Sequence, residues 1–138
     1  MSPRRLSALL ACALIALALA GCGRGADERT VGSVTQRFLQ AVEAKDGAVA
    51  CAQLTSAAVQ QLESEESKPC PQAVTSVQAS PGPVRRAAVY ITSAKVDLTN
   101  GESAFLNRTS AGWKLSAVGC KPQAGKPADQ PYDCDLEA

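Results

Sequence analysis

Histidine is absent from this chain of 138 residues, and only 4% of its residues are aromatic. Without histidine the chain cannot build a Ser-His-Asp or Cys-His catalytic site, and it lacks the commonest general base near neutral pH. Lys and Arg number 14 and Asp and Glu number 13, a net charge of +1 with no basic stripe interleaved with aromatic residues. These absences exclude most familiar enzyme mechanisms and predict that the protein binds no nucleic acid.

The N-terminus has the pattern of an export signal. Arg4 and Arg5 precede the uncharged run 6–20, which is shorter than the roughly 20 apolar residues that span a bilayer. The run ends in Leu19-Ala20-Gly21-Cys22, and the polar segment after it contains no stop-transfer pattern. This tetrapeptide resembles the lipobox of bacterial lipoproteins, in which a diacylglyceryl group is attached to the cysteine and a peptidase cuts before it.

The resemblance implies that residues 1–21 are a lipoprotein signal peptide, cut between Gly21 and Cys22. Cys22 would then carry a palmitate-type lipid anchor that holds the protein on the outer face of the cytoplasmic membrane. Two or more acyl chains on one residue anchor a protein durably, whereas one chain does so only marginally. Two alternatives stay open: an ordinary secretory signal in which Cys22 is incidental, and export by the twin-arginine route through Arg4-Arg5.

Four cysteines remain after Cys12 leaves with the signal and Cys22 is acylated. An even number of cysteines in an exported chain predicts disulfide bonds. Their spacing in sequence, 19 and 14 residues within two distant groups, predicts the pairs Cys51–Cys70 and Cys120–Cys134. The close cysteine pairs of structural zinc sites and the C-x-x-C pattern of redox enzymes are both missing. We therefore predict no metal site and no other cofactor.

Helices are expected in the first half of the domain. Residues 22–30 are rich in glycine and charge and predict a flexible tether, followed by a single domain over residues 31–138. From Val31 onward, apolar residues recur with helical spacing as far as Lys45. Asp46 and Thr55 are candidate N-caps for two shorter helices. The further helical segments are predicted at 48–54, 57–62 and, as a single turn, 72–77.

The pattern changes from helix to strand after the Pro-Gly loop at residues 80–83. A strand with a bend near Ser93 is predicted over residues 87–99, and Asn100-Gly101 predicts a type I′ hairpin turn. Two further antiparallel strands are expected at 103–108 and 113–118, with a tail at 132–137 that folds back as an edge strand. Helices followed by an antiparallel meander define an α+β class.

Several short motifs together carry a family resemblance. They are Ala44-Lys45-Asp46-Gly47, Ala50-Cys51-Ala52-Gln53-Leu54, Asn100-Gly101-Glu102, Gly112-Trp113-Lys114-Leu115 and Val118-Gly119-Cys120. In this order they resemble small alanine-rich lipoproteins of high-GC Gram-positive bacteria with a fold similar to nuclear transport factor 2 (NTF2). The resemblance implies short helices packed on a curved antiparallel sheet that forms a cone over residues 31–120, with residues 131–134 as a tail. Because fewer strands can be counted than a full cone contains, both a complete and a truncated cone remain open.

The wider superfamily includes ketosteroid isomerases, cyclases and dehydratases, whose pockets use carboxylates, tyrosine or histidine, and histidine is absent here. The candidate reactive residues here are Tyr90, Asp97 and Glu102. Asp97 and Glu102 flank a hairpin and alternate with apolar residues, which is also typical of a solvated outer face. Phe38, Tyr90 and Trp113 are candidates to line a pocket, although aromatic residues at such positions are more often part of the core.

Three hypotheses about function follow. The favoured one is a non-enzymatic binding module at the cell envelope, which binds an envelope protein or a small apolar or cell-wall ligand. The second is an envelope enzyme of the isomerase or dehydratase type. The third is a purely structural surface domain. The first is favoured because the chain has neither histidine nor a catalytic motif.

Overall fold

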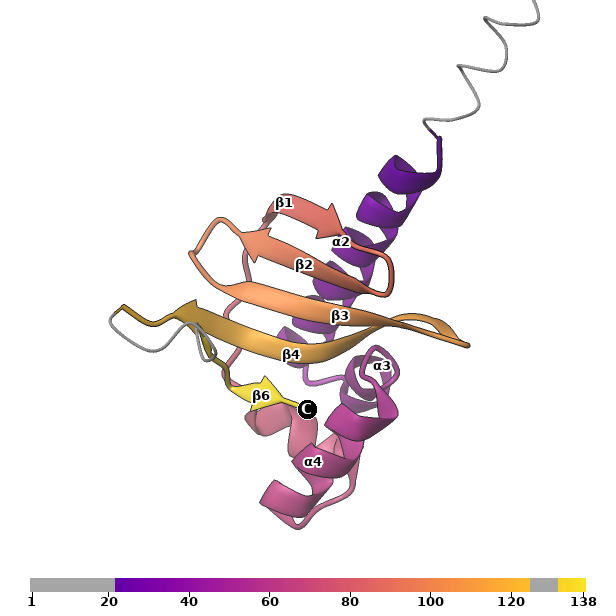
Figure 1. The fold of residues 1–138 in the computed structure, drawn as a ribbon. Coiled ribbons are helices and arrows are strands. Elements are labelled where there is room, and N and C mark those ends of the chain that lie inside the picture. The colour runs from indigo at the N-terminus through magenta and orange to yellow at the C-terminus, as the bar shows by residue number, and fades with distance from the viewer. Residues whose placement is uncertain (1–21, 125–131) are drawn as a thin grey trace, which may run out of the picture.

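The computed structural model describes residues 22–124 and 132–138 as an antiparallel sheet with a long helix across one face and shorter helices at one end (Figure 1). The predicted signal peptide, residues 1–21, and the predicted cut after Gly21 lie outside the described residues. The helical elements, in chain order, are α2 (Cys22–Glu43), α3 (Gly47–Cys51), α4 (Ser56–Glu66), α5 (Cys70–Ala73) and the 3-10 turn η1 (Val74–Ser76).

Within the described residues the sheet has six strands: β1 (Val84–Val89), β2 (Ser93–Leu98), β3 (Ser103–Thr109), β4 (Gly112–Pro122), β5 (Tyr132–Asp133) and β6 (Leu136–Glu137). Consecutive strands from β1 to β5 are antiparallel neighbours, and β6 also pairs with β4. The α+β class, the meander and the return of the tail to the last long strand are therefore confirmed.

Helix α2 packs its apolar stripe on one face of the sheet, where it contacts β1, β2 and β4. Val31 and Phe38 are fully buried on this stripe, and the hydroxyl of Thr35 between them donates to the Val31 carbonyl at 2.9 Å. On the sheet side the buried residues alternate along β2, as a half-covered strand requires, whereas β4 is buried continuously from Leu115 to Cys120. The buried residues of the sheet include Ala94, Val96, Leu98, Leu106 and Leu115.

Helix α2 begins at Cys22, so residues 22–30 are helical and not the irregular tether that composition predicts. Contacts with residues far along the chain stabilise these additional helical turns, and composition gives no information about such contacts. Asp27 accepts hydrogen bonds from Arg108 and Trp113 on the sheet, and the hydroxyl of Thr30 donates to the Ala26 carbonyl. Contact with the sheet therefore holds the first turns of α2 in a helix.

The single strand predicted over residues 87–99 is in fact two strands joined by a turn at residues 90–92. Tyr90 N–H donates to the Ser93 carbonyl at 2.8 Å and closes this turn. The apolar and β-branched residues Val89, Tyr90 and Ile91 read as strand because they favour extended backbone, and none of them is a usual turn residue. The bend predicted near Ser93 is the only trace of this turn in the sequence.

The turn at Asn100-Gly101 is present but is not of type I′, which needs positive φ at both central residues. Gly101 has φ +89°, whereas Asn100 has no positive φ. Leu98 N–H donates to the Glu102 carbonyl at 2.9 Å across a three-residue loop. Gly101 N–H also donates to the Leu98 carbonyl at 3.3 Å, so the hairpin is of the kind in which a turn is followed by a glycine in the left-handed region.

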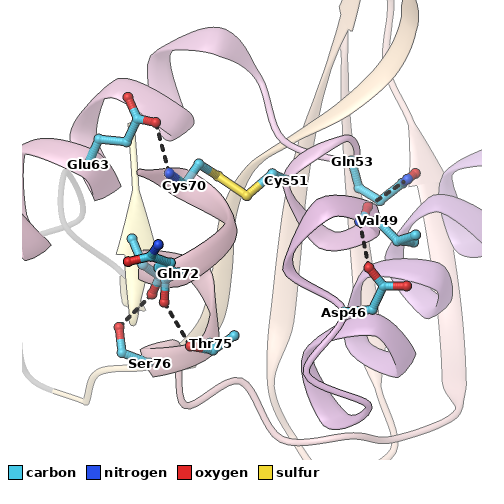
Figure 2. The surroundings of a disulfide bond; sticks show 10 residues. Asp46, Val49, Cys51, Gln53, Glu63, Cys70, Gln72, Thr75 and Ser76 are labelled. Carbon is cyan, nitrogen blue, oxygen red and sulfur yellow. Dashed lines mark hydrogen bonds between the residues drawn. A yellow bond between two sulfur atoms is a disulfide. The ribbon is translucent and has the colours of Figure 1, made fainter. Parts of the chain in front are cut away.

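The first disulfide bond joins α3 to α5 (Figure 2). Cys51 and Cys70 are paired with their Cα atoms 6.1 Å apart, as their spacing predicts. Asp46 caps α3 by accepting from Val49 N–H at 3.1 Å, and the carboxylate of Glu63 on α4 accepts from Cys70 N–H at 2.8 Å. The disulfide bond and the Glu63 hydrogen bond thus join α3, α4 and α5 to one another.

The second predicted pair, Cys120–Cys134, is also present and attaches the C-terminal tail to the end of β4. On one side of it Lys121 and Pro122 pair with β5, and on the other Ala117 and Val118 pair with β6. Leu136 of β6 is buried in the core. The tail therefore completes the sheet edge and contributes to the core.

Candidate functional site

A groove of about 680 Å³ opens where the first two turns of α2 pass the turn between β1 and β2. It is lined by Arg24 and Asp27 from the helix, by residues 89–93 from the turn, and by Arg108 from β3. We call it the α2–turn groove. Its volume lies in the range of small-molecule sites, and its lining combines apolar and charged side chains, as binding sites do.

Asp27 connects the helix to the sheet at the base of the α2–turn groove. Trp113 Nε1–H donates to Asp27 Oδ1 at 3.1 Å, and Arg108 forms an ion pair with Oδ2 at 2.5 Å. The Arg108 guanidinium also lies 4.5 Å from the centre of the Trp113 ring, a cation–π contact. The hydrogen bond from Trp113, and then that from Arg108, hold the pKa of Asp27 below its ordinary value of 3.8.

The lowered pKa of Asp27 predicts an acid-sensitive contact. A group with a depressed pKa stabilises the fold above its ordinary pKa and loses that effect as the pH falls through the lowered value. Trp113 is the sole tryptophan and reports on this contact by fluorescence. We expect its emission to be constant near neutral pH and to change only below pH 3.8. In Asp27→Asn this transition should be absent, and its persistence there would contradict the assignment.

Tyr90 and Ile91 form the exposed rim of the α2–turn groove. Ile91 is 92% exposed and Tyr90 is 62% exposed. Their turn is nevertheless well held, because Arg108 N–H donates to the Thr92 carbonyl at 2.8 Å and Tyr90 N–H donates to Ser93. Two apolar side chains are thus presented to the outside on a fixed backbone.

The three predicted pocket residues occupy different places. Phe38 is fully buried in the core between α2 and the sheet. Trp113 is also buried, at 5% exposure, and supports the groove through Asp27 and Arg108 without being on its surface lining. Tyr90 alone lines the α2–turn groove. The three side chains therefore do not enclose one common cavity.

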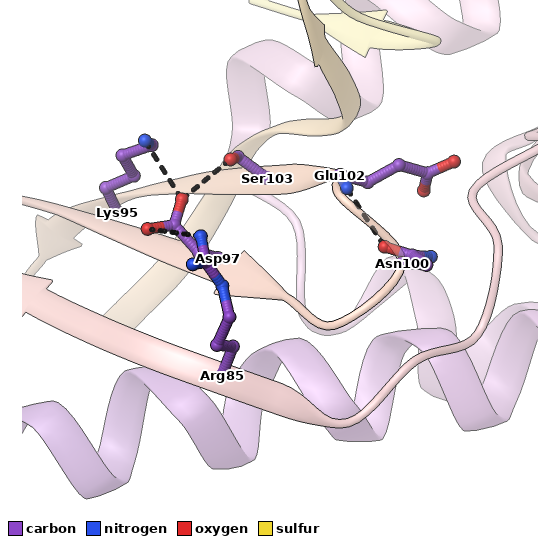
Figure 3. Close-up of polar contacts among 6 residues, drawn as sticks. All are labelled: Arg85, Lys95, Asp97, Asn100, Glu102 and Ser103. Carbon is purple, nitrogen blue, oxygen red and sulfur yellow. Dashed lines mark hydrogen bonds and ion pairs between the residues drawn. The ribbon is translucent and has the colours of Figure 1, made fainter.

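Asp97 belongs to a polar cluster on the sheet face that α2 does not cover (Figure 3). It accepts from Lys95 at 2.9 Å and from the Ser103 hydroxyl at 2.8 Å, and Arg85 lies 3.8 Å away. Partial burial acts to raise the pKa of Asp97, but the hydrogen bonds from Lys95 and Ser103 outweigh it and the net pKa is lowered.

Lys95 completes this cluster. Its contact with the Tyr132 hydroxyl, aided by Asp97, holds the Lys95 pKa above the ordinary value of 10.5 despite partial burial. The Lys95 ammonium also lies 5.1 Å from the centre of the Tyr132 ring. Lys95 therefore stays protonated and Asp97 stays ionised near neutral pH. Neither group has a pKa near neutral pH, as a group that transfers protons at that pH needs, and the Ser103 hydroxyl has no effective base beside it.

Glu102 lies at the β2–β3 hairpin and is 5% exposed. Its carboxylate accepts from Ser80 N–H at 3.1 Å and lies 3.7 Å from the Lys121 ammonium. Tyr90 is at the other end of β2, where about 13 Å of strand separates Ser93 from Asp97 at roughly 3.3 Å per residue. The three predicted reactive residues, Tyr90, Asp97 and Glu102, are therefore not brought together on one cavity.

Three residues of the α2–turn groove, Arg24, Asp27 and Arg108, were not expected from the sequence. The Asp27–Arg108 pair joins positions 81 residues apart. Arg24 and Asp27 lie in the segment predicted as a tether, and no motif marks them. Periodicity extended backward from Val31 shows only that Asp27 lies four residues earlier, on the same face of a helix.

None of the helices in the described part of the chain combines the length and the apolar character needed to cross a bilayer. Comparison with known proteins found no matching family model, no matching curated protein and no matching solved structure. The site must therefore be interpreted from its own chemistry.

Proposed function

We propose that this protein is a bacterial lipoprotein, anchored through Cys22 to the outer face of the cytoplasmic membrane. The observation that carries the proposal is the position of the lipobox-like Leu19-Ala20-Gly21-Cys22. Its last residue, Cys22, is also the first residue of helix α2, which is docked on the sheet through Asp27. In this arrangement the lipid-bearing residue is the first residue of a rigid element, and the domain lies directly at the membrane.

We further propose that the domain is a non-enzymatic binding module whose site is the α2–turn groove. The groove presents Tyr90 and Ile91 beside Arg24 and Arg108, a combination suited to an amphipathic partner in the envelope. Support also comes from the separation of Tyr90, Asp97 and Glu102 and from the charge states of Lys95 and Asp97, which disfavour the isomerase-type alternative.

We infer that the fold is an NTF2-like cone in truncated form. The inference is supported by the order of elements, helices first and then a meander, and by the long helix lying across one face of the sheet (Figure 1). The space that would hold a deep ligand in a full cone is occupied by core side chains. Phe38, Leu106 and Leu115 are among the largest fully buried side chains there.

The anchor is tested by replacing Cys22 with alanine in cells that export the protein. Mass spectrometry of the N-terminal peptide is expected to find acyl chains on Cys22 in the parent and none in Cys22→Ala. Cys12→Ala is the matched control, since that cysteine lies within the signal and its loss leaves acylation intact. An unmodified Cys22 in the mature parent would overturn the proposal. An uncut signal could hold the Cys22→Ala variant in the membrane, but mass spectrometry detects the acyl chains themselves and is not affected by such retention.

A further inference from the structure

The turn between β1 and β2 carries an apolar tip that the fold itself does not use. In the described part of the chain three large apolar side chains are exposed, and Tyr90 and Ile91 are the two most exposed of them. They are adjacent and lie on a backbone held by hydrogen bonds to Ser93 and Arg108. Isolated exposed apolar residues are common on protein surfaces and need no explanation. Adjacent ones on a fixed turn, in contrast, are a feature of interaction surfaces.

The position of this tip relative to Cys22 limits what it can meet. Arg24 and Asp27, which line the α2–turn groove together with Tyr90 and Ile91, follow Cys22 by two and five residues. A helix rises about 1.5 Å per residue, so they lie about 3 and 7.5 Å from Cys22 along the axis. The groove is therefore within reach of a surface to which Cys22 is attached. Figure 1 shows the β1–β2 turn beside α2, and α4 at the opposite end of the molecule from the start of α2.

The charges around the tip favour an anionic surface. Arg24 and Arg108 line the α2–turn groove beside the tip. Asp27 is the one carboxylate among the lining residues, so two cations face one acid. Asp27 is already bonded to Arg108 and Trp113, and Arg24 is exposed to solvent. Exposed basic side chains near an anionic bilayer are attracted to it.

We propose that the β1–β2 turn is a second membrane contact, with Tyr90 and Ile91 inserted among the headgroups of the bilayer that holds the Cys22 lipid. This inference rests on the proposed anchor and names the ligand of the α2–turn groove as an anionic phospholipid surface. Tyrosine favours the interface because its ring is apolar and its hydroxyl stays hydrated, and Arg24 meets the lipid phosphates. The contact fixes the orientation of the domain and turns α4 away from the membrane.

The test uses the mature protein purified from the membranes of cells that export it, reconstituted into phosphatidylcholine vesicles that contain one third phosphatidylglycerol. Ile91→Trp places a fluorophore at the tip, and Gln60→Trp places one at an exposed position of α4 as the matched control. Both retain Trp113, whose signal is subtracted using the parent. Vesicles with brominated acyl chains quench a tryptophan that enters the bilayer. We expect about twofold quenching for Ile91→Trp, as for side chains that enter the headgroup boundary, and none for Gln60→Trp.

Two failures are distinguishable in this experiment. If the protein floats with the vesicles but the tryptophan at position 91 is quenched no more than that at position 60, the turn does not contact the membrane and the inference is overturned. The proposed anchor survives that result. If the protein does not float with the vesicles and its mass shows no acyl chains, the anchor itself is absent and both proposals fall.

Discussion

Phe38→Ala is expected to lower the free energy of unfolding by about 4 kcal/mol, within the range of about 3–5 kcal/mol for buried phenylalanines. Phe38 is fully buried on the sheet-facing stripe of α2. Its removal takes away the apolar area it buries and leaves a cavity that a close-packed core closes only in part. The loss would be a large share of the stability of a domain of this size, which is commonly about 5–15 kcal/mol.

Equilibrium unfolding in urea, followed by circular dichroism, measures this effect. Ile91→Ala is the matched control, because it removes a large apolar side chain that is 92% exposed and should change stability by no more than about 0.5 kcal/mol. A cost for Phe38→Ala as small as that of the control would show that Phe38 does not contribute to the core. That result would restore the hypothesis that Phe38 lines an open pocket.

The local elements were predictable because their signals are local. The apolar stripe from Val31 to Phe38 predicted the long helix, and Thr55 predicted the start of α4, where its hydroxyl accepts from Ala58 N–H. Sequence spacing also predicted both disulfide pairs, because the fold brings each of these cysteines within bonding distance of the one nearest to it in sequence. Helix caps, amphipathic periods and short loop closures depend on residues close in the chain.

The α2–turn groove was not predictable because it depends on contacts between distant residues. Nothing near Asp27 in the sequence indicates that Arg108 and Trp113 hold it, yet these bonds extend the helix back to Cys22. The turn at residues 90–92 was hidden for a related reason. The Arg108 N–H bond to the Thr92 carbonyl holds it in place, and side chains that favour strands occupy it. Tertiary contacts thus overrode local propensity at the place where the candidate site forms.

Replacing Cys51 and Cys70 together with alanine is expected to lower the free energy of unfolding by about 3 kcal/mol. The bond closes a loop of 19 residues in sequence, and the loop-entropy relation gives about this value for restraining the unfolded chain. The effect should spread through the short helices, because α3 and α5 are joined to each other by this bond and the segment that follows α3 is hydrogen-bonded to the sheet. There Thr55 N–H donates to the Leu115 carbonyl, and Leu115 N–H donates to Gln53, both at 2.8 Å.

The matched control is the double replacement of Cys120 and Cys134, which removes a bond of similar span, 14 residues. Its entropic value is also about 3 kcal/mol, but the bond attaches only the tail that carries β5 and β6. We therefore expect the Cys120/Cys134 variant to lose amide-exchange protection first at Leu136 and its partner Val118, with α3 and α5 still protected. The Cys51/Cys70 variant should lose protection throughout the short helices. If both variants lost protection in the same amides, the two bonds would stabilise one cooperative unit, and the local role assigned to the second bond would be wrong.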